Sequence, residues 1–451
     1  MSAVDVLVAE IGSTTTVVNA FAGIREGVPR LVGQGQAPTT VLDGDVTIGL
    51  DGAIEALEQQ LGSPLSWQEM LASSSAAGGL RMTVHGLVYE MTVKAAKEAA
   101  LGAGANIHLV TAGELSEADL SEIKSINPNI ILLAGGVDYG EKQTVITNAR
   151  RLAATISPSI PVIYAGNKAA KQQVYEILSS CGFGVKAVDN VYPRIDQLTI
   201  EPTRRVIHEV FEKHIIEAPG MHKIRQLITG RIIPTPGAVM QAARLLHEEI
   251  GDLVVLDVGG ATTDVHSVAE TDPEVAAILI TPEPLAKRTV EGDLGVYVNS
   301  ANVLALADLD KLCERLSCQP EQLIDLRTPL PVTTAEKEFA GILTEIAAAT
   351  AIKRHAGNIE YIYGPTGRMA VARGKDLTGV KWLIGTGGAL TRLPVGYTAL
   401  QKLNSLSGST CLLPRNAEAL IDNHYVIAAA GVLAERYPVA ALQIMKQSLH
   451  I

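Results

Sequence analysis

The first forty residues alternate apolar runs with polar turns, a pattern typical of β-strands. Residues 4–10 and 17–21 are apolar, and the turn between them, residues 11–16, contains one glycine and four hydroxyl side chains. Two such runs joined by a short glycine-containing turn predict a β-hairpin. Further strands are predicted at residues 30–36 and 45–49, and a helix at residues 52–62, where apolar side chains recur at helical spacing.

From residue 87 the pattern changes to strands that alternate with helices. Strands separated by helices of this length predict βαβ units and a parallel sheet, with helices on both faces. We therefore expect residues 83–191 to form an inserted α/β domain. The predicted strands are 107–111, 130–134, 162–165 and 185–188, and the predicted helices are 87–102, 116–125, 141–155 and 169–180.

The loop at residues 134–138 follows a predicted strand and precedes a helix, the usual position of a ligand in a parallel sheet. It lacks the GxGxxG pattern of dinucleotide binding and the DxHxxG pattern of cobalamin carriers. Two interpretations remain for it, a tight structural turn and a loop that contacts a partner.

The stretch at residues 253–268 repeats the pattern of the amino terminus. An apolar run ends near Asp257, a glycine pair and a threonine-rich turn follow, and a second short strand comes next. A third glycine cluster, residues 385–388, comes directly after the apolar residues 382–384. The chain therefore contains three glycine-rich turns, each preceded by a predicted buried strand.

Composition limits the possible functions. A chain of 451 residues is too long for one core, and 47% hydrophobic residues indicate a globular protein. The net charge of -11 argues against nonspecific binding of nucleic acid, and no apolar run reaches the length of a membrane span. The four cysteines show no CxxC pair or zinc-site spacing. The amino terminus lacks the basic start of a secretion signal, so we expect a cytoplasmic protein.

The glycine-rich turns carry the chemistry needed to bind a phosphorylated ligand. Adjacent glycines let the backbone approach an anion closely, and their N–H groups can form an anion-binding concavity. Threonine and serine hydroxyls can donate to phosphate oxygens, and Asp257 can hold a metal ion through water. One such turn alone would be interpreted as a plain hairpin. Three of them, in this order and spacing, indicate a nucleotide site.

These motifs resemble those of the acetate and sugar kinase, heat-shock ATPase and actin superfamily. Residues 10–16 stand where that superfamily has its first phosphate motif, residues 257–264 its second, and residues 383–390 its adenosine motif. The resemblance implies a two-domain actin-like (ribonuclease H-like) α/β fold, here with an inserted parallel α/β domain. It also implies that the domains close on ATP or ADP and Mg²⁺, held between the two hairpins.

Within that superfamily the chain resembles the accessory proteins of glutamate (methylaspartate) mutase, thought to be reactivating chaperones of adenosylcobalamin enzymes. The resemblance extends over nearly the whole chain. Its partner is then expected to be an adenosylcobalamin-dependent mutase, with glutamate mutase as the leading candidate and an aminomutase as the next. These proteins share a name with a DNA mismatch-repair factor, an activity that nothing in the sequence suggests. The motifs are EIGSTTTVVNAF, ASSSAAGGLRM, VEGDLGV, RGKDLTGV and LIGTGGALTRLP.

The resemblance also implies a division of the chain. The predicted parts are a first ATPase domain (1–82), an inserted, partner-binding domain (83–191), a return to the first domain (192–236), a second domain (237–425) and a carboxyl-terminal helical return (426–451). Small side chains at residues 236–238 and 428–433 suit the close packing of two helices between the domains, where the superfamily has its hinge.

Site residues follow from the same motifs. The first phosphate turn is assigned to Gly12, Ser13, Thr14 and Thr15, the second to Gly259, Gly260 and Thr262, and the adenosine pocket to Gly385, Gly387 and Gly388. Asp257 and Glu10 are the predicted catalytic and metal-shell residues. The superfamily has Asp where this chain has Glu10, and many relatives have glycine where it has Ala261. Because Mg²⁺ requires strict octahedral geometry, the longer Glu10 side chain predicts ATP binding with slow hydrolysis.

Three functions compete at this point. The first is an ATP-driven chaperone that opens a cobalamin enzyme so that damaged cofactor can leave. The second is a small-molecule kinase, in which Asp257 would serve as the base, although no acceptor-site signature accompanies it. The third is a filament-forming structural ATPase. An inserted α/β domain suits partner binding better than either rival function.

Overall fold

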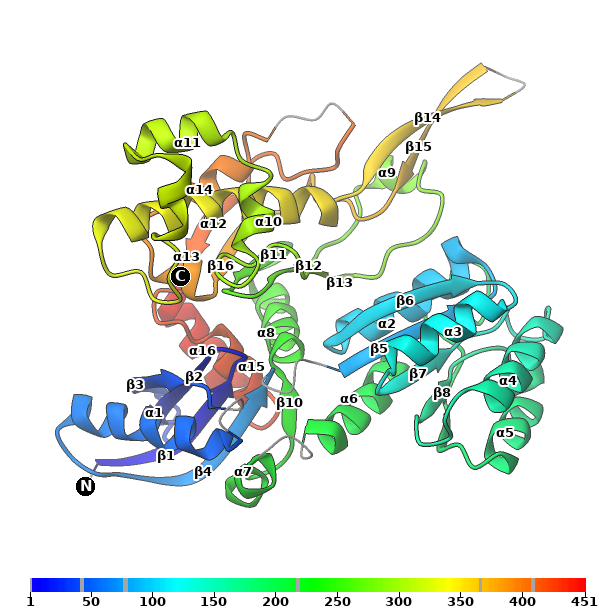
Figure 1. Ribbon diagram of the computed structural model, residues 1–451, viewed down its shortest axis with the longest axis horizontal. Coiled ribbons are helices and arrows are strands. Elements are labelled where there is room, and N and C mark those ends of the chain that lie inside the picture. Colours follow the sequence, from blue (N-terminus) through cyan, green and yellow to red (C-terminus); the bar gives the residue numbers. More distant parts are fainter. Residues whose placement is uncertain (1, 41–43, 76–79, 216–219, 365–366, 407–409) are drawn as a thin grey trace.

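The computed structural model describes residues 2–40, 44–75, 80–215, 220–364, 367–406 and 410–451, and in them three five-stranded sheets organise the chain (Figure 1). We call the parts built on these sheets the first lobe, the second lobe and the inserted unit (residues 80–191). Residues 76–79, part of the serine- and glycine-rich motif, lie outside the described residues.

The first lobe is a mixed sheet in the order β10-β4-β1-β2-β3. The first three strands form an antiparallel meander, and β4 and β10 run parallel to β1. The bounds are β1 (Ser2–Ile11), β2 (Thr15–Ala22), β3 (Arg30–Pro38), β4 (Leu65–Ser74), β10 (Ile232–Pro234) and helix α1 (Val46–Leu61).

The prediction of a strand at residues 45–49 is wrong, because helix α1 begins there. The Asp45 carboxylate accepts a hydrogen bond from the Thr47 N–H at 2.9 Å, which makes Asp45 the N-cap of the helix. A cap of this kind satisfies a backbone donor that has no partner within the helix. The apolar residues Val46 and Leu50 are therefore buried in the first turns of α1.

The second lobe repeats the first in strand order and direction. Its sheet runs β13-β12-β11-β16-β17, again with an antiparallel meander and two strands added in parallel. The sequence predicted a repeat of the two hairpins, and the structure extends the repeat to whole sheets. The predicted fold class is confirmed. The bounds are β11 (Leu253–Val258), β12 (Thr263–Val268), β13 (Ala286–Glu291), β16 (Trp382–Thr386) and β17 (Glu418–Ile421).

Helices and one long hairpin complete the second lobe, and the hairpin projects from it (Figure 1). Helix α12 begins with a capping box formed by Thr333 and Glu336 and packs its apolar side chains against the sheet. The bounds are α9 (Pro273–Ala276), α10 (Ser300–Leu304), α11 (Leu309–Leu316), the 3₁₀-helix η3 (Pro320–Ile324), α12 (Thr334–His355), β14 (Asn358–Gly364), β15 (Gly367–Arg373), α13 (Gly388–Thr391) and α14 (Gly396–Leu403).

The inserted unit is an all-parallel sheet in the order β6-β5-β7-β8-β9, with helices against it. The predicted strands and helices are present, but the predicted helix at 87–102 is divided at Lys94. The bounds are β5 (Leu80–Gly86), the π-helix η1 (Tyr89–Val93), α2 (Lys94–Gly102), β6 (Ala105–Ala112), α3 (Glu117–Ile126), β7 (Ile130–Leu133), α4 (Gln143–Thr155), β8 (Val162–Tyr164), η2 (Lys168–Ala170), α5 (Lys171–Ser180) and β9 (Val185–Ala187).

Strand β5 lies inside this sheet and was not predicted from the sequence. It begins at Leu80, before the predicted domain boundary at residue 83. Its polar side chains Thr83 and His85 are buried, and His85 makes hydrogen bonds with Thr83 and Thr111 at 2.9 and 2.8 Å. Two buried positions of this strand are therefore polar, with their hydrogen bonds satisfied inside the sheet. For that reason the strand does not appear as an apolar run in the sequence.

Two helices connect the lobes at their shared apolar core. Helices α8 (Thr235–Ile250) and α15 (Ile427–Leu433) approach so closely that a Cβ added at Gly431 would lie 1.9 Å from the Ala238 carbonyl oxygen. The predicted close packing of the two small-residue segments is confirmed, while their role as a hinge stays a prediction. The remaining helices are α6 (Glu201–Ile215), α7 (Met221–Leu227) and α16 (Pro438–Leu449).

Among the described residues, no helix combines the length and the hydrophobicity that a membrane span needs.

Candidate nucleotide site

The two predicted phosphate turns have the same local geometry. The Gly12 N–H donates to the Thr15 carbonyl at 3.0 Å, and the Gly259 N–H donates to the Thr262 carbonyl at 2.9 Å. A Cβ added at Gly12 would lie 2.5 Å from the Thr15 oxygen, so the first turn requires glycine. Each turn therefore closes its hairpin in the same way, directly after the strand that carries an acidic residue.

A cavity of about 350 Å³ lies between the two turns. Most of the predicted phosphate and metal residues line it. Gly12 and Thr15 close the first turn through their hydrogen bond but do not line the cavity. The lining residues that the sequence predicted are Glu10, Ser13, Thr14, Asp257, Gly259, Gly260 and Thr262. The predicted phosphate turns are thus brought together, although their role in binding stays a prediction.

The glycines assigned to the adenosine pocket lie in three different environments. A Cβ at Gly385 would contact the apolar side chains of the second lobe's core, 2.9 Å from Leu400. Gly387 has φ +83°, and its Cβ would lie 2.4 Å from the Asp257 carboxylate, so it allows β16 to approach that acid. Gly388 is exposed and borders open space. None of the three lines the cavity between the two turns, and their assignment to an adenosine pocket stays a prediction.

The acids at the cavity are poorly compensated by positive charge. Burial raises the pKa of Glu10 from 4.5 to about 8, with further contributions from the charges of Asp257 and Asp422. Burial likewise raises the pKa of Asp257 from 3.8 to about 7, and the charges of Asp264 and Asp422 add to that effect. A group of carboxylates this short of cations is electrostatically suited to a divalent metal ion.

This charge arrangement predicts a pH-dependent stability of the nucleotide-free protein. In the unfolded chain the Glu10 carboxyl ionises near its ordinary pKa of 4.5, whereas the folded protein retains that proton up to about pH 8. The stabilising contribution is therefore complete below pH 4.5 and is lost as the pH rises to 8, by about 1.4 kcal/mol per pH unit at most. We expect this contribution to lower the thermal midpoint by several degrees between pH 5 and pH 8, relative to a variant in which residue 10 does not titrate.

The Glu10→Gln variant provides the check on this prediction, because its amide does not titrate. In scanning calorimetry from pH 5 to pH 8, the thermal midpoint of the wild type should fall relative to that of Glu10→Gln. Glu26→Gln, at an exposed glutamate after β2, should retain the wild-type dependence. Equal slopes in all three proteins would show that Glu10 is ionised in the folded state.

The residues at the cavity fit a magnesium–nucleotide complex. The uncompensated carboxylates Glu10 and Asp257 match the charge of Mg²⁺, and the hydroxyls of Ser13, Thr14 and Thr262 match phosphate oxygens. Within the described part of the chain, no group of three or more His, Cys, Asp or Glu side chains could hold a metal ion by itself. Mg²⁺ at such a site would take most of its ligands from phosphates and water, as it usually does in phosphoryl-transfer sites.

Two polar pairs lie beside the acidic residues of the cavity, and sequence reasoning missed both. Thr386 on β16 donates to Asp422 at 2.9 Å, and Asp422 accepts from the first N–H groups of α15. The Tyr425 hydroxyl donates to Glu10 at 3.4 Å from a backbone with φ +51°. Asp422 and Tyr425 lie in a loop without a motif, so the sequence offers no signal for either.

The cavity has a third wall, which comes from outside the two lobes. Gly104 and Asn106 at the start of β6 line it, and so does Phe211 on α6. The inserted unit therefore reaches the space between the phosphate turns. The sequence predicted the insertion but not this contact, because a lone Gly and Asn carry no recognisable pattern.

The VEGDLGV motif supports the second phosphate turn. The N–H groups of Val296 and Tyr297 donate to the carbonyls of Gly259 and Gly260 at 3.1 and 2.9 Å. A Cβ at Gly295 would lie 2.3 Å from the Ala261 carbonyl, so the motif packs directly on the turn. Its glycine is required by this close approach.

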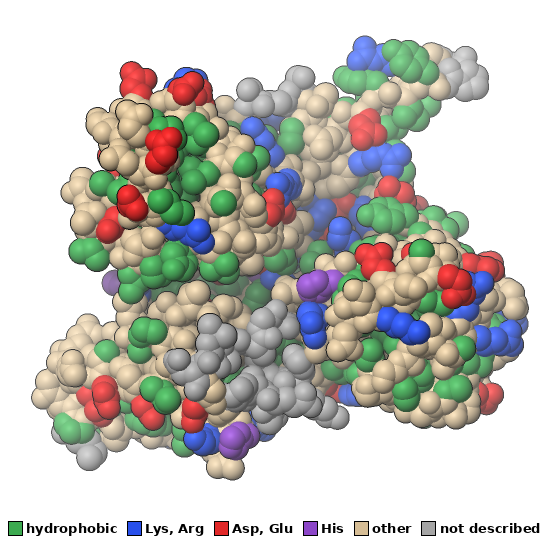
Figure 2. Space-filling view, in the orientation of Figure 1, with side chains coloured by type: hydrophobic (Ala, Val, Ile, Leu, Met, Phe, Trp, Pro, Cys, Tyr) green, Lys and Arg blue, Asp and Glu red, His purple; other side chains and the backbone are tan. Residues whose placement is uncertain are grey.

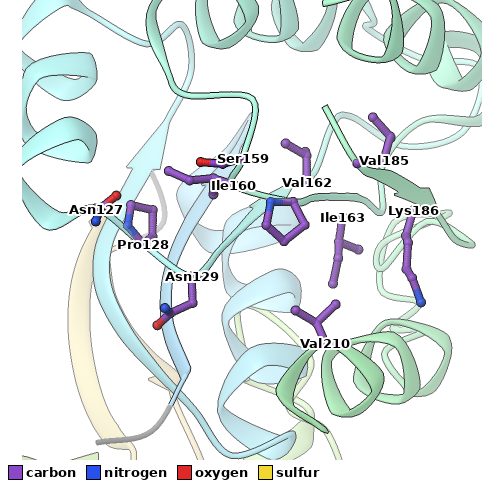
Figure 3. A pocket seen from close by; sticks show the side chains of 12 residues that line it. Asn127, Pro128, Asn129, Ser159, Ile160, Val162, Ile163, Val185, Lys186 and Val210 are labelled. Atoms are coloured by element: carbon purple, nitrogen blue, oxygen red, sulfur yellow. The ribbon is translucent and has the colours of Figure 1, made fainter. Parts of the chain in front are cut away.

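Two other cavities lie in the inserted unit, away from the predicted site residues. One of about 530 Å³ is at the amino ends of β7, β8 and β9, and the residues that line it include Pro128, Ile160, Val185 and Val210 of α6 (Figure 3). The other, of about 580 Å³, is at the carboxyl ends of the same strands and is lined by Tyr139 and Arg194 among other polar residues. Of these three cavities, the one between the phosphate turns is bordered by the predicted phosphate motifs.

Two lobes of equal strand order, meeting at a cavity between two hydroxyl-rich turns, define the fold of the actin, heat-shock ATPase and sugar kinase superfamily. Residues 6–449 match the family described as MutL protein, and the chain belongs to that family. Protein MutL of Clostridium tetanomorphum is 39% identical over 460 residues, covering 98% of each chain. The family predicted from the sequence motifs is confirmed.

Solved structures with a related arrangement are much more distant. The nucleotide-free diol dehydratase-reactivating factor is 13% identical, with a TM-score of 0.36 over 96% of this chain and 99% of that one. A ROK family glucokinase from Streptomyces griseus, in complex with glucose and AMPPNP, is 10% identical, with a TM-score of 0.35 over 98% of this chain and 99% of that one. Values this low carry no information about function.

Proposed function

We propose that this protein is an ATP-binding, chaperone-like accessory factor that reactivates an adenosylcobalamin-dependent mutase. Glutamate mutase is the first candidate partner and an aminomutase the second. In this proposal the nucleotide state of the protein controls the release of damaged cobalamin from the mutase. Membership of the MutL protein family and the resemblance of the motifs to glutamate mutase accessory proteins support this choice.

The observation that carries the proposal is the composition of the cavity between the phosphate turns. Two walls come from the equivalent turns of the two lobes, and the third comes from the inserted unit through Gly104 and Asn106. A ligand bound there would touch all three parts of the molecule at once. Nucleotide binding can then change the position of the unit proposed to contact the mutase, which is what a chaperone cycle requires.

The site residues take the following roles in this proposal. The hydroxyls and backbone of the two turns would bind the phosphates, and Asp257 and Glu10 would hold Mg²⁺ through water. Bound Mg²⁺ would neutralise charge on the phosphates, and catalysis would otherwise consist of positioning and electrostatic stabilisation. Asp257 is also placed to orient an attacking water. The proposed activity is therefore a slow hydrolysis of ATP.

Glu10 is expected to limit that hydrolysis. In the variant Glu10→Asp the shorter side chain restores the superfamily residue, which should raise the hydrolysis rate or change the preference between Mg²⁺ and Mn²⁺. Glu10→Ala should instead weaken metal-dependent turnover. Steady-state phosphate release in each metal measures both effects. Equal rates and equal metal dependence in all three proteins would remove Glu10 from the metal shell.

A pull-down from native cell extract, with and without ATP, tests the proposed class of function. Recovery of a cobalamin mutase in a nucleotide-dependent manner supports the proposal. ATP consumption that depends on a small-molecule acceptor would identify a kinase instead. Sedimentation of the purified protein that depends on ATP would identify a filament-forming ATPase.

A further inference from the structure

Charged side chains are buried where helix α2 of the inserted unit, together with α6, packs against strand β13 of the second lobe. Arg288 is 1% exposed, and Glu98 and Arg204 are each 4% exposed. In Figure 2, basic and acidic side chains meet in the hollow between the second lobe and the inserted unit. Burying charges is costly unless each is fully paired, so this junction differs in kind from the apolar core between the lobes.

The pairing at this junction is incomplete. Lys94 and Lys287 form ion pairs with Glu283. Within the described part of the chain, however, several buried polar atoms have no hydrogen-bond partner: Glu98 Oε2, Thr203 Oγ1, Arg204 Nε and both ring nitrogens of His266. Each such atom costs about 1–3 kcal/mol. The contact between the inserted unit and the second lobe is therefore weakly stabilised, as expected of a contact that is made and released.

One buried guanidinium connects this junction to the cavity between the phosphate turns. Arg288 donates from Nε and Nη2 to Asp264 Oδ1 at 2.9 and 2.6 Å, and from Nη1 to the Leu101 carbonyl at 3.0 Å. Asp264 and Arg288 both line the cavity, and Leu101 lies in the last turn of α2. Carbonyls at a helix carboxyl terminus carry partial negative charge, so the guanidinium holds two negative groups from two parts of the molecule.

We propose that Arg288 couples nucleotide occupancy of the cavity to the seating of the inserted unit. A phosphate group in the cavity competes with the Leu101 carbonyl for the guanidinium, because a charged oxygen is the stronger acceptor. Drawn toward the phosphate, Arg288 releases the end of α2, and the incompletely paired junction opens. This inference rests on the proposed nucleotide site and adds to it the residue that transmits the nucleotide state.

Hydrogen exchange of residues 94–104 in the full-length protein tests the coupling, with ATP binding measured separately by calorimetry. Saturating Mg²⁺–ATP should speed exchange in this segment of the wild type by at least about fivefold. Arg288→Lys retains the charge but cannot hold Asp264 and Leu101 at once, since lysine lacks the planar fork. Its exchange should be fast without nucleotide and should change little when ATP is added.

Arg204→Lys is the matched control for a purely structural effect. Arg204 is also buried at the same junction and donates to the Ala286 carbonyl at 3.2 Å, but it does not line the cavity. In Arg204→Lys, ATP should still speed the hydrogen exchange of residues 94–104. If that response is lost in both Arg204→Lys and Arg288→Lys, the specific role of Arg288 is overturned. Unchanged exchange in a wild type that binds ATP would overturn the coupling alone. A wild type that binds no ATP would overturn the proposed function, and the coupling with it.

Discussion

The substitution Gly259→Val is expected to abolish ATP binding. A Cβ at this position would lie 3.2 Å from the Thr262 carbonyl oxygen, inside the turn that borders the cavity, and the branched side chain would occupy phosphate space. We expect an affinity loss of at least about 100-fold, equivalent to about 2.7 kcal/mol. Isothermal titration calorimetry with Mg²⁺ present measures the loss.

Gly292→Val is the matched control for this variant. Gly292 lies beyond the end of β13 in the same lobe, a Cβ there meets nothing within 4 Å, and the residue does not line the cavity. Its ATP affinity should equal that of the wild type. Circular dichroism should show both variants folded. Unchanged ATP affinity in a folded Gly259→Val protein would mean that the nucleotide site lies elsewhere.

The inserted unit is expected to carry the contact with the mutase. Its loop after β7 presents Tyr139, which is 81% exposed and held at φ +61°. Asn167 fixes this loop by accepting from the Tyr139 N–H at 2.9 Å and donating to the carbonyl of Gly140 at 3.1 Å. Ile195, 70% exposed, follows Arg194, which lines the same cavity as Tyr139. Rigid, exposed aromatic and apolar side chains of this kind dominate the energy of protein interfaces.

The double variant Tyr139→Ala, Ile195→Ser should therefore weaken mutase binding by at least about 30-fold while leaving ATP affinity unchanged. Removing the whole unit would test less, because its core is continuous with that of the first lobe and excision would expose apolar residues. Tyr363→Ala is the control, since this tyrosine is 82% exposed on the projecting hairpin. Surface plasmon resonance on immobilised mutase measures the affinity of each variant. A loss of affinity confined to Tyr363→Ala would place the partner surface on that hairpin.

The hydrophobic pattern predicted the hairpins and the parallel sheet, and the resemblance of the glycine-containing motifs to those of the superfamily predicted the fold class. Apolar runs on either side of small turns specify hairpins locally, and strands that alternate with helices specify a parallel sheet. What the pattern missed has identifiable causes. Strand β5 buries His85 and Thr83 as a hydrogen-bonded pair, and the start of α1 depends on one capping interaction by Asp45. Neither depends on an apolar run.

The candidate site likewise contains residues that the sequence predicted and residues that it did not. Residues of the two turns belong to contiguous motifs, and most of them line one cavity, while their role in binding stays a prediction. Arg288 and Asp422 reach the same site from separate parts of the sequence, and their positions depend on tertiary packing. Lys375, inside the RGKDLTGV motif, proves to be buried and donates to three backbone carbonyls. A motif can therefore mark a structural requirement as readily as a ligand contact.

The most direct measurement of the central claim is the recovery of an inactivated mutase. Glutamate mutase loaded with cobalamin that has lost its adenosyl group is incubated with this protein, Mg²⁺–ATP and free adenosylcobalamin, and mutase activity is followed together with cobalamin release. We predict that activity returns only when ATP and the protein are both present, and that Gly259→Val restores none. Recovery that is independent of ATP, or no recovery with glutamate mutase or an aminomutase as partner, would contradict the account.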